Sequence, residues 1–94
     1  MHIIAGHLSV VPERRDEYLS KCTDAVLAAR SAPGCIDFAL SADLLQPERV
    51  NVFECWQDVA SVEAFRGSGP DDELTELITG ADVSQHEVVS SVQL

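Results

Sequence analysis

The sequence predicts an α+β fold of the ferredoxin-like type, in which a four-stranded antiparallel sheet carries helices on one face only. Apolar side chains alternate in some segments and recur at helical spacing in others. The two kinds of segment follow one another in the order β-α-β-β-α-α-β, which is the split βαβ arrangement. A length of 94 residues allows one domain, spanning residues 1–94.

The first half of the chain supplies a strand, a helix and a second strand. The segment from His2 to Val11 is rich in Ile, Val and Leu, as expected for a strand. Pro12 follows, with a fixed φ that suits the first turn of a helix. This helix ends near Ser31, because a Pro-Gly pair comes next. The second strand is expected from Cys35 to Ser41.

The second half begins with a hairpin connection over Ala42–Glu48 and a third strand over Arg49–Trp56. Asp58 is a suitable N-cap for the next helix, which carries Val59, Val62 and Phe65 at helical spacing and ends at the segment G-S-G-P over 67–70. A further helix is expected from Pro70 through Ile78, stopped by Gly80. The last strand is expected from Val83 to Val92.

Both faces of the predicted sheet carry apolar side chains, although helices cover only one of them. In the first strand, Ile4 and Leu8 share one phase, whereas Ile3 and Ala5 share the other. The third strand repeats this pattern. An apolar sheet face without helices indicates a partner surface. The simplest partner is a second copy, in a twofold homodimer that packs sheet against sheet.

The chain is acidic, with 16 Asp and Glu against 6 Lys and Arg and a net charge of −10. This charge repels phosphate backbones and anionic lipids, so neither a nucleic acid nor a membrane is an expected partner. Three cysteines without C-x-x-C spacing predict free thiols in a reducing compartment. The first residues show no export signal, and the expected location is the cytoplasm.

Three segments of the sequence have the order and spacing of the motifs of a known protein family. The segment A-P-G-C-I-D-F at 32–38 is similar to the family motif P-G-C-x-x-[FY] at the entry to strand two. The segment V-F-E-C-W-Q-D at 52–58 is similar to the motif E-x-W-x-[SD] at the end of strand three, and S-V-E-A-F at 61–65 is similar to the helix that follows. The sequence thus resembles the antibiotic biosynthesis monooxygenase family, which implies a dimeric α+β barrel with a pocket between sheet and helices.

Trp56 and Glu54 are the candidate catalytic residues. In the family a Trp at this position lines the ligand pocket, where an indole face stacks on flat aromatic ligands and its N–H orients a carbonyl. Glu54 is a candidate general base for a phenol or quinol. The structural alternatives are a Trp that closes the core and a carboxylate paired with Arg49, Arg66 or backbone donors. Six further residues are candidates for substrate binding: Gly6, Tyr18, Phe38, Val52, Phe65 and His86.

The resemblance also has departures. Haem-degrading members carry an Asn where Gly6 stands and a His where Phe65 stands, so haem binding is not expected. Oxygenase members use an Asn and a Tyr near the Trp, whereas here Asn51 is one residue out of phase and Val62 replaces the Tyr. His7 and His86 lie on neighbouring strands, but no third ligand has a suitable spacing for a metal site.

The function expected from the residues and the resemblance is a cofactor-independent monooxygenase acting on a small aromatic, quinol or polyketide-type molecule. The alternative is a dimeric module that binds or sequesters a small apolar molecule without turnover.

Overall fold

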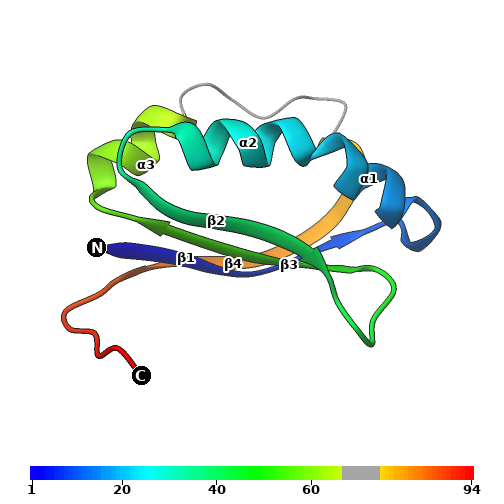
Figure 1. The fold of residues 1–94 in the computed structure, drawn as a ribbon. Coiled ribbons are helices and arrows are strands. Elements are labelled where there is room, and N and C mark those ends of the chain that lie inside the picture. The colour runs from blue at the N-terminus through cyan, green and yellow to red at the C-terminus, as the bar shows by residue number, and fades with distance from the viewer. Residues whose placement is uncertain (67–74) are drawn as a thin grey trace.

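The computed structural model describes residues 1–66 and 75–94 as an antiparallel sheet covered by helices (Figure 1). A short 3-10 turn, η1 (Pro12–Arg14), leads into the first helix. The strands and helices are β1 (His2–Val10), α1 (Arg15–Lys21), α2 (Thr23–Ser31), β2 (Cys35–Ala42), β3 (Arg49–Trp56), α3 (Val59–Arg66) and β4 (Ile78–Glu87). Within the described ranges, no helix is both long and apolar enough to cross a membrane.

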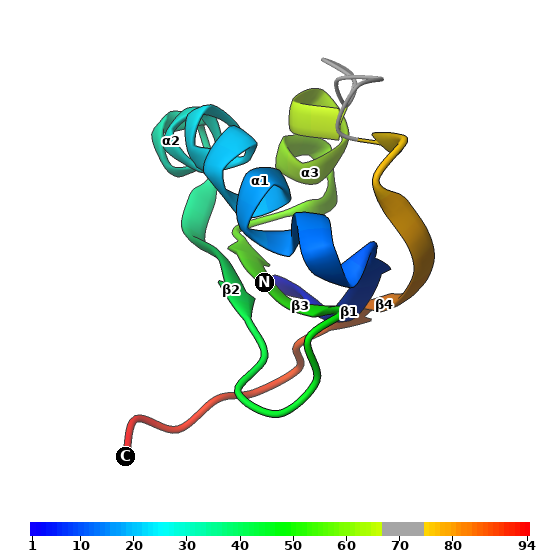
Figure 2. The same ribbon diagram turned by 90° about the vertical axis from the view of Figure 1, so that its right-hand side faces the viewer.

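The sheet has the order β2-β3-β1-β4, and every neighbouring pair is antiparallel. The helices lie on one face of this sheet, which is plain in both ribbon views (Figures 1 and 2). The predicted fold class is therefore confirmed.

The core lies between the helices and one phase of the strands. In β3, Val50, Val52, Glu54 and Trp56 are buried on this side. The buried residues form two clusters. One holds Ile4, Ala29, Phe38, Trp56 and Val62, and the other holds Val10, Tyr18, Cys22, Val50 and Leu77. Trp56 thus belongs to a cluster that α2 and α3 cover.

The other sheet face has no helix over it. Cross-strand partners place Ala5 beside Phe53, and Phe53 beside Ala39. Phe53 is 39% exposed at the middle of this face. Towards one end the face becomes polar, with His7 opposite Asp82. The prediction of apolar residues on the uncovered face is correct for its central part, where a partner surface is expected.

Two glycines occupy positions that other residues would strain. Gly6 has φ +149°, and a Cβ there would lie 2.0 Å from the Asp82 carbonyl oxygen on β4. Gly34 has φ +82° in the turn before β2, and its Cβ would lie 2.0 Å from Ser61 Oγ on α3. These glycines allow β4 to approach β1 and α3 to approach the turn after α2.

The structure corrects the helix and strand boundaries at three places. The predicted helix from Pro12 to Ser31 is divided at Cys22 into two α-helices, although it ends at Ser31 as expected. The last strand runs from Ile78 to Glu87 and not from Val83 to Val92. Gly80 lies inside this strand, opposite Ser9, and does not stop a helix.

The physical reason for the earlier start of β4 is pairing. The nine residues of β1 need hydrogen-bond partners on both sides, and β4 supplies them as far back as Ile78, which pairs with Val10. Leu77 is buried, and its carbonyl oxygen accepts the Val11 N–H at 3.3 Å. The predicted helix from Pro70 lies mostly in residues 67–74, outside the described residues.

Candidate functional site

Trp56 ends β3 and is completely buried. Its position follows from the alternation of β3, which directs every second side chain towards the helices. The indole packs with Ile4, Ala29 and Val62 in the core cluster. Its ring centroid lies 5.3 Å from that of Phe65 on α3, with an angle of 35° between the planes. In this arrangement Trp56 closes the layer between sheet and helices.

Glu54 lies two residues earlier on the same face and is only 4% exposed. Its Oε1 accepts the Trp56 Nε1–H at 3.0 Å, and its Oε2 accepts a hydrogen bond from Arg66 Nη2 at 2.9 Å. The Arg66 side chain is 53% exposed, so this ion pair runs from the core to the surface. The buried carboxylate is therefore paired on both oxygens, and the Trp56 N–H is already in use.

The pairing with Arg66 is one of the alternatives that the sequence left open. Arg49, the other arginine considered, points to the hairpin at the opposite end of β3. Its Nε donates to Asn51 Oδ1 at 2.7 Å and lies 3.6 Å from Asp43 Oδ1. Glu54 thus holds the indole in place and connects it to α3.

Phe65 connects this buried group to the surface. Its ring lies 5.8 Å from that of Phe38 at an angle of 65°, and close to Trp56 on the other side. Aromatic rings at these separations attract one another beyond simple area burial. Three of the candidate residues, Trp56, Phe38 and Phe65, therefore form one aromatic group with Glu54 beside it.

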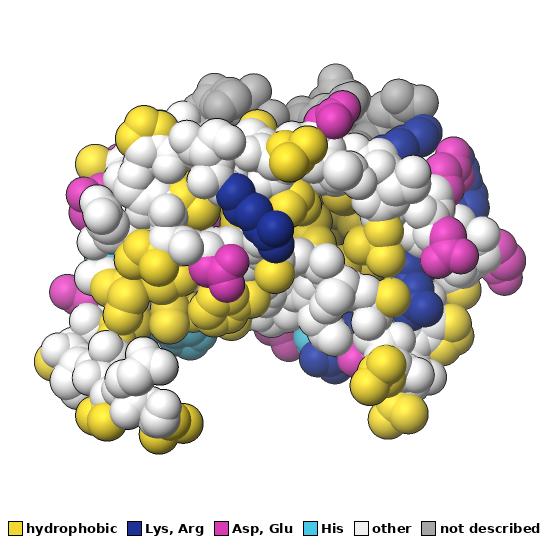
Figure 3. Space-filling view, in the orientation of Figure 1, with side chains coloured by type: hydrophobic (Ala, Val, Ile, Leu, Met, Phe, Trp, Pro, Cys, Tyr) yellow, Lys and Arg dark blue, Asp and Glu magenta, His cyan; other side chains and the backbone are white. Residues whose placement is uncertain are grey.

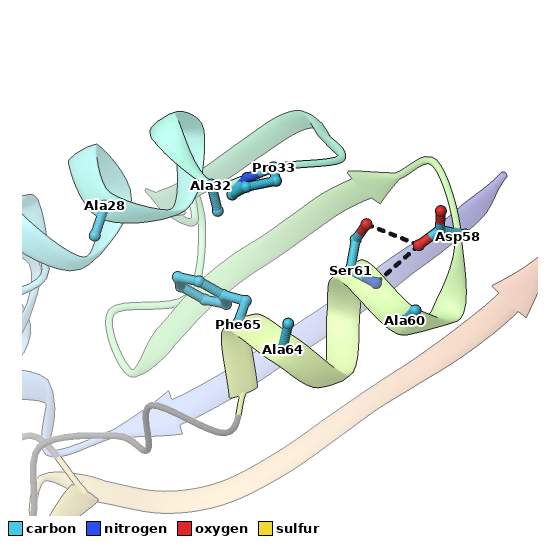
Figure 4. Close-up of a pocket in the computed structure, with 8 residues that line it drawn as sticks. All are labelled: Ala28, Ala32, Pro33, Asp58, Ala60, Ser61, Ala64 and Phe65. Carbon is cyan, nitrogen blue, oxygen red and sulfur yellow. Dashed lines mark hydrogen bonds between the residues drawn. The ribbon is translucent and has the colours of Figure 1, made fainter.

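A groove of about 540 Å³ lies between α2 and α3, with Phe65 at its floor (Figure 4). The groove is lined by small and apolar residues with one polar pair: Ala28, Ala32, Pro33, Asp58, Ala60, Ser61, Ala64 and Phe65. Figure 4 shows the Phe65 ring directed towards α2. Trp56 does not line this groove, whereas Phe65, whose ring packs near the indole, does.

The polar pair in the groove also starts α3. Asp58 Oδ1 accepts the Ser61 N–H at 2.8 Å and the Ser61 hydroxyl at 2.7 Å, as an N-cap does. These hydrogen bonds hold the pKa of Asp58 below its usual range, with the Ser61 hydroxyl as the largest cause. The groove therefore contains a carboxylate, but one already engaged by the helix it caps.

The remaining candidate residues lie apart from the aromatic group. Tyr18 is buried in the second core cluster beside Cys22, and burial raises the pKa of its phenol. Val52 is buried opposite Gly6 on β1. His86 is exposed and pairs with Ile3, which places it on the sheet face turned away from the helices.

His7 and His86 share that uncovered face, because their partners Asp82 and Ile3 fix their phases. His86 lies opposite Ile3, four residues along β1 from His7, so the two histidines do not form a cross-strand pair. Among residues 1–66 and 75–94, no group of three or more His, Cys, Asp or Glu side chains is placed to hold a metal ion. All three cysteines are free thiols.

The groove itself is the feature that the sequence reasoning missed. Ala28 on α2 and Ala32, which directly follows the last residue of α2, are four residues apart, and Ala60 and Ala64 are four residues apart on α3. Such a spacing places small side chains on one face of each helix. This was the available signal, although alanine carries no chemistry that would mark a site.

Comparison with known proteins agrees with this architecture. The sequence profile of the family described as antibiotic biosynthesis monooxygenase matches residues 1–73. The uncharacterized protein sll1783 of Synechocystis is 26% identical over 61 residues, which are 65% of this chain and 42% of that protein. The chain therefore spans less than half the length of this relative.

Solved structures share the fold at low identity. A crystal structure from Deinococcus radiodurans, whose name assigns it provisionally to the same family, has a TM-score of 0.85 at 22% identity and covers 100% of this chain and 98% of its own. A protein from Nitrosomonas europaea with the same provisional name has a TM-score of 0.85 at 12% identity, covering 96% and 100%. At these identities the likeness establishes the fold.

Proposed function

Since the chain belongs to the antibiotic biosynthesis monooxygenase family, we propose that it is a cofactor-independent monooxygenase of a small aromatic, quinol or polyketide-type molecule. The observation that carries this proposal is the aromatic group of Trp56, Phe38 and Phe65 beneath an apolar groove of about 540 Å³. Grooves of this size suit ligands of a few fused rings.

In the proposed reaction, the ionised substrate reduces O₂ directly. For a substrate whose reacting carbon is a CH₂ group activated by a neighbouring ring, that carbon gives up four electrons and two protons. One oxygen atom enters the product as C=O, and the other leaves as water. Because O₂ accepts all four electrons, no further reductant is needed. The contribution of the protein is an apolar environment that orients the substrate and favours its ionised form.

The roles of the named residues follow from their positions. The substrate lies in the groove against Phe65, and Trp56 and Phe38 support that ring from below. Glu54 holds the indole through Nε1 and is the nearest buried carboxylate. To act as a general base, Glu54 would have to exchange its hydrogen bond from Arg66 for one from the substrate.

The alternative function is binding without turnover. One observation favours it: the two polar side chains in the groove, Asp58 and Ser61, bind each other, and Glu54 is fully paired beneath. A site of this kind holds an apolar molecule but offers it no free acid or base.

Oxygen uptake separates the two functions. The protein is mixed with a panel of hydroquinones and anthrone-type compounds, and O₂ consumption is recorded alongside quenching of its single tryptophan. Saturable quenching with oxygen uptake supports the oxygenase. Saturable quenching without uptake leaves the binding module, and neither signal with any compound contradicts both.

The Glu54→Gln variant tests the role of the carboxylate. The amide oxygen still accepts the Trp56 N–H, whereas the charge and the basic oxygen are lost. Loss of a general base lowers turnover about 100-fold or more. Unchanged turnover in this variant removes Glu54 from the reaction and leaves it a structural role.

We also propose that the chain acts as a homodimer through the uncovered sheet face. The support is the exposed Phe53 among apolar neighbours on that face. Light scattering at micromolar concentration should give twice the chain mass of 10.2 kDa. A mass of one chain would contradict the proposal.

A further inference from the structure

The hairpin between β2 and β3 holds two leucines almost fully in solvent. Leu44 is 99% exposed and Leu45 is 90% exposed. The backbone that carries them is tightly held: Asp43 Oδ2 accepts the N–H groups of Leu45 at 3.0 Å and of Gln46 at 2.9 Å. The two apolar side chains therefore stand at the tip of an ordered turn.

A second set of contacts fixes this tip to the helical layer. Arg15 on α1 donates from Nη1 to the carbonyl oxygens of Gln46 at 2.8 Å, Asp43 at 3.3 Å and Arg49 at 3.4 Å. Asn51 Nδ2 donates to Asp43 Oδ1 at 3.1 Å. A cation and several hydrogen bonds thus hold a loop whose two leucine side chains are almost fully exposed.

The other end of the molecule carries a matching feature. Residues 88–94 leave β4 as an extended arm, which begins with a hydrogen bond from Val88 N–H to the Met1 carbonyl oxygen at 2.9 Å. The apolar side chains of the arm, Val89, Val92 and Leu94, are almost fully exposed. The arm and the hairpin tip project from opposite ends of the sheet, both towards the side without helices (Figures 1 and 2).

Figure 3 shows these two apolar projections with the sheet edge between them. A twofold axis that lies between two facing sheets and runs across their strands exchanges the ends of the molecule. The hairpin end of one copy then comes to the arm end of the other. The dimer then contains this contact twice, once at each end, and both copies use the same surface.

We propose that Leu44 and Leu45 of each copy pack against the C-terminal arm of a second copy, which fixes the orientation of the dimer. This inference rests on the homodimer proposed above and goes beyond it in assigning the contact. A second copy is the occupant that this arrangement favours, because the hairpin tip and the arm lie at opposite ends of the molecule, towards the same side, and a twofold axis brings one to the other.

Cross-linking between two variants, each with one introduced cysteine, tests the contact. Leu44→Cys and Val92→Cys are each made in a Cys35→Ser background, in which the remaining thiols, Cys22 and Cys55, are buried. The two chains are co-expressed with different tags and treated with a short bismaleimide. We expect a product that joins Leu44→Cys of one chain to Val92→Cys of the other. A Leu27→Cys chain, modified on the exposed side of α2, should not cross-link to Val92→Cys.

Weakening of the dimer provides the second measurement. Replacing both leucines by serine should raise the dissociation constant at least about 100-fold, whereas Leu27→Ser should leave it unchanged. Two results would overturn this contact and leave the homodimer standing. In the first, a stable dimer forms cross-links only between two Leu44→Cys chains. In the second, the serine variant keeps the dissociation constant of the unchanged protein. A monomeric mass would overturn both. Binding to anionic vesicles that depends on the two leucines would also overturn it. Oxygen uptake is measured in a separate experiment, so failure of the dimer contact can be distinguished from failure of the proposed enzymatic activity.

Discussion

The ion pair between Arg66 and Glu54 allows a quantitative test of the site. We consider Arg66→Ala beside the control Arg14→Ala. Arg14 forms a similar ion pair with Glu17, at 2.7 Å against 2.9 Å for Arg66 and Glu54. The two carboxylates differ in burial, because the side chain of Glu54 is 6% exposed and that of Glu17 is 41% exposed. Glu17 also has Lys21 Nζ at 3.4 Å, so its exposure and this second cation both make Arg14→Ala the milder change.

The expected costs follow from this difference. Removing one partner from a fully buried ion pair costs about 3–5 kcal/mol, whereas an exposed pair contributes about 0.2–1 kcal/mol. Arg66 is half exposed and Glu54 is buried, so we expect Arg66→Ala to lower the free energy of unfolding by about 2 kcal/mol. We expect about 0.5 kcal/mol or less for Arg14→Ala.

Urea unfolding followed by the fluorescence of Trp56 measures both values at one fixed protein concentration. For a chain of this size the slope is about 1 kcal/mol/M, so the midpoint should fall by about 2 M for Arg66→Ala and by about 0.5 M for Arg14→Ala. Arg66→Lys keeps a charge near Glu54 and should recover part of the loss. Equal midpoints for the two alanine variants would refute the reasoning, because burial of Glu54 would then have no consequence.

Three further predictions concern other parts of the fold. Gly6→Ala should lower the free energy of unfolding in urea by about 2 kcal/mol or more, because the added Cβ would meet a β4 carbonyl oxygen at 2.0 Å. The control Gly80→Ala, whose Cβ would have its nearest neighbour at 3.7 Å, should change this free energy little. Equal losses in the two variants would contradict this explanation. The backbone N–H of Gln46, with the other donors of the turn, lowers the pKa of Asp43 from 3.8 to about 2. A depressed pKa in the folded state contributes stability above pH 4 that is lost as the pH falls through about 2, so the amide NMR signals of the turn should titrate with a midpoint near 2, and a midpoint near 4 would show that the hydrogen bonds are absent. Phe65→Ala should make Trp56 accessible to acrylamide, since the removed ring both packs near the indole and lines the groove. Unchanged quenching would show that other side chains shield the indole.

The helix-facing phase of β3 was predictable from the sequence because a strand has a period of two residues. Once Trp56 was assigned to the inner side, Glu54 and Val52 had to share it. The choice between a free base and a paired carboxylate was not predictable, since it depends on Arg66 reaching back from α3 to a residue twelve positions earlier.

The last strand shows where local sequence signals fail. The segment T-G-A-D at 79–82 has poor strand propensity, and Gly80 favours the end of a helix. Tertiary pairing overrides both, because β1 presents backbone groups that β4 alone can satisfy on that side. Gly6 was predicted to bind substrate, whereas in the structure the need for glycine at this position comes from the close approach of β4.

The contact of Gly34 with Ser61 has a consequence for the groove. The turn after α2 meets the first turn of α3 so closely that no side chain fits between them, and this meeting point sets how far apart the two helices stand at one end of the groove. Gly34 does not line the groove. Its neighbour Pro33 and its contact Ser61 do line it, so a methyl group added at Gly34 would push against Ser61 and widen this end of the groove. A residue outside the groove would thereby change the size of molecule that fits there.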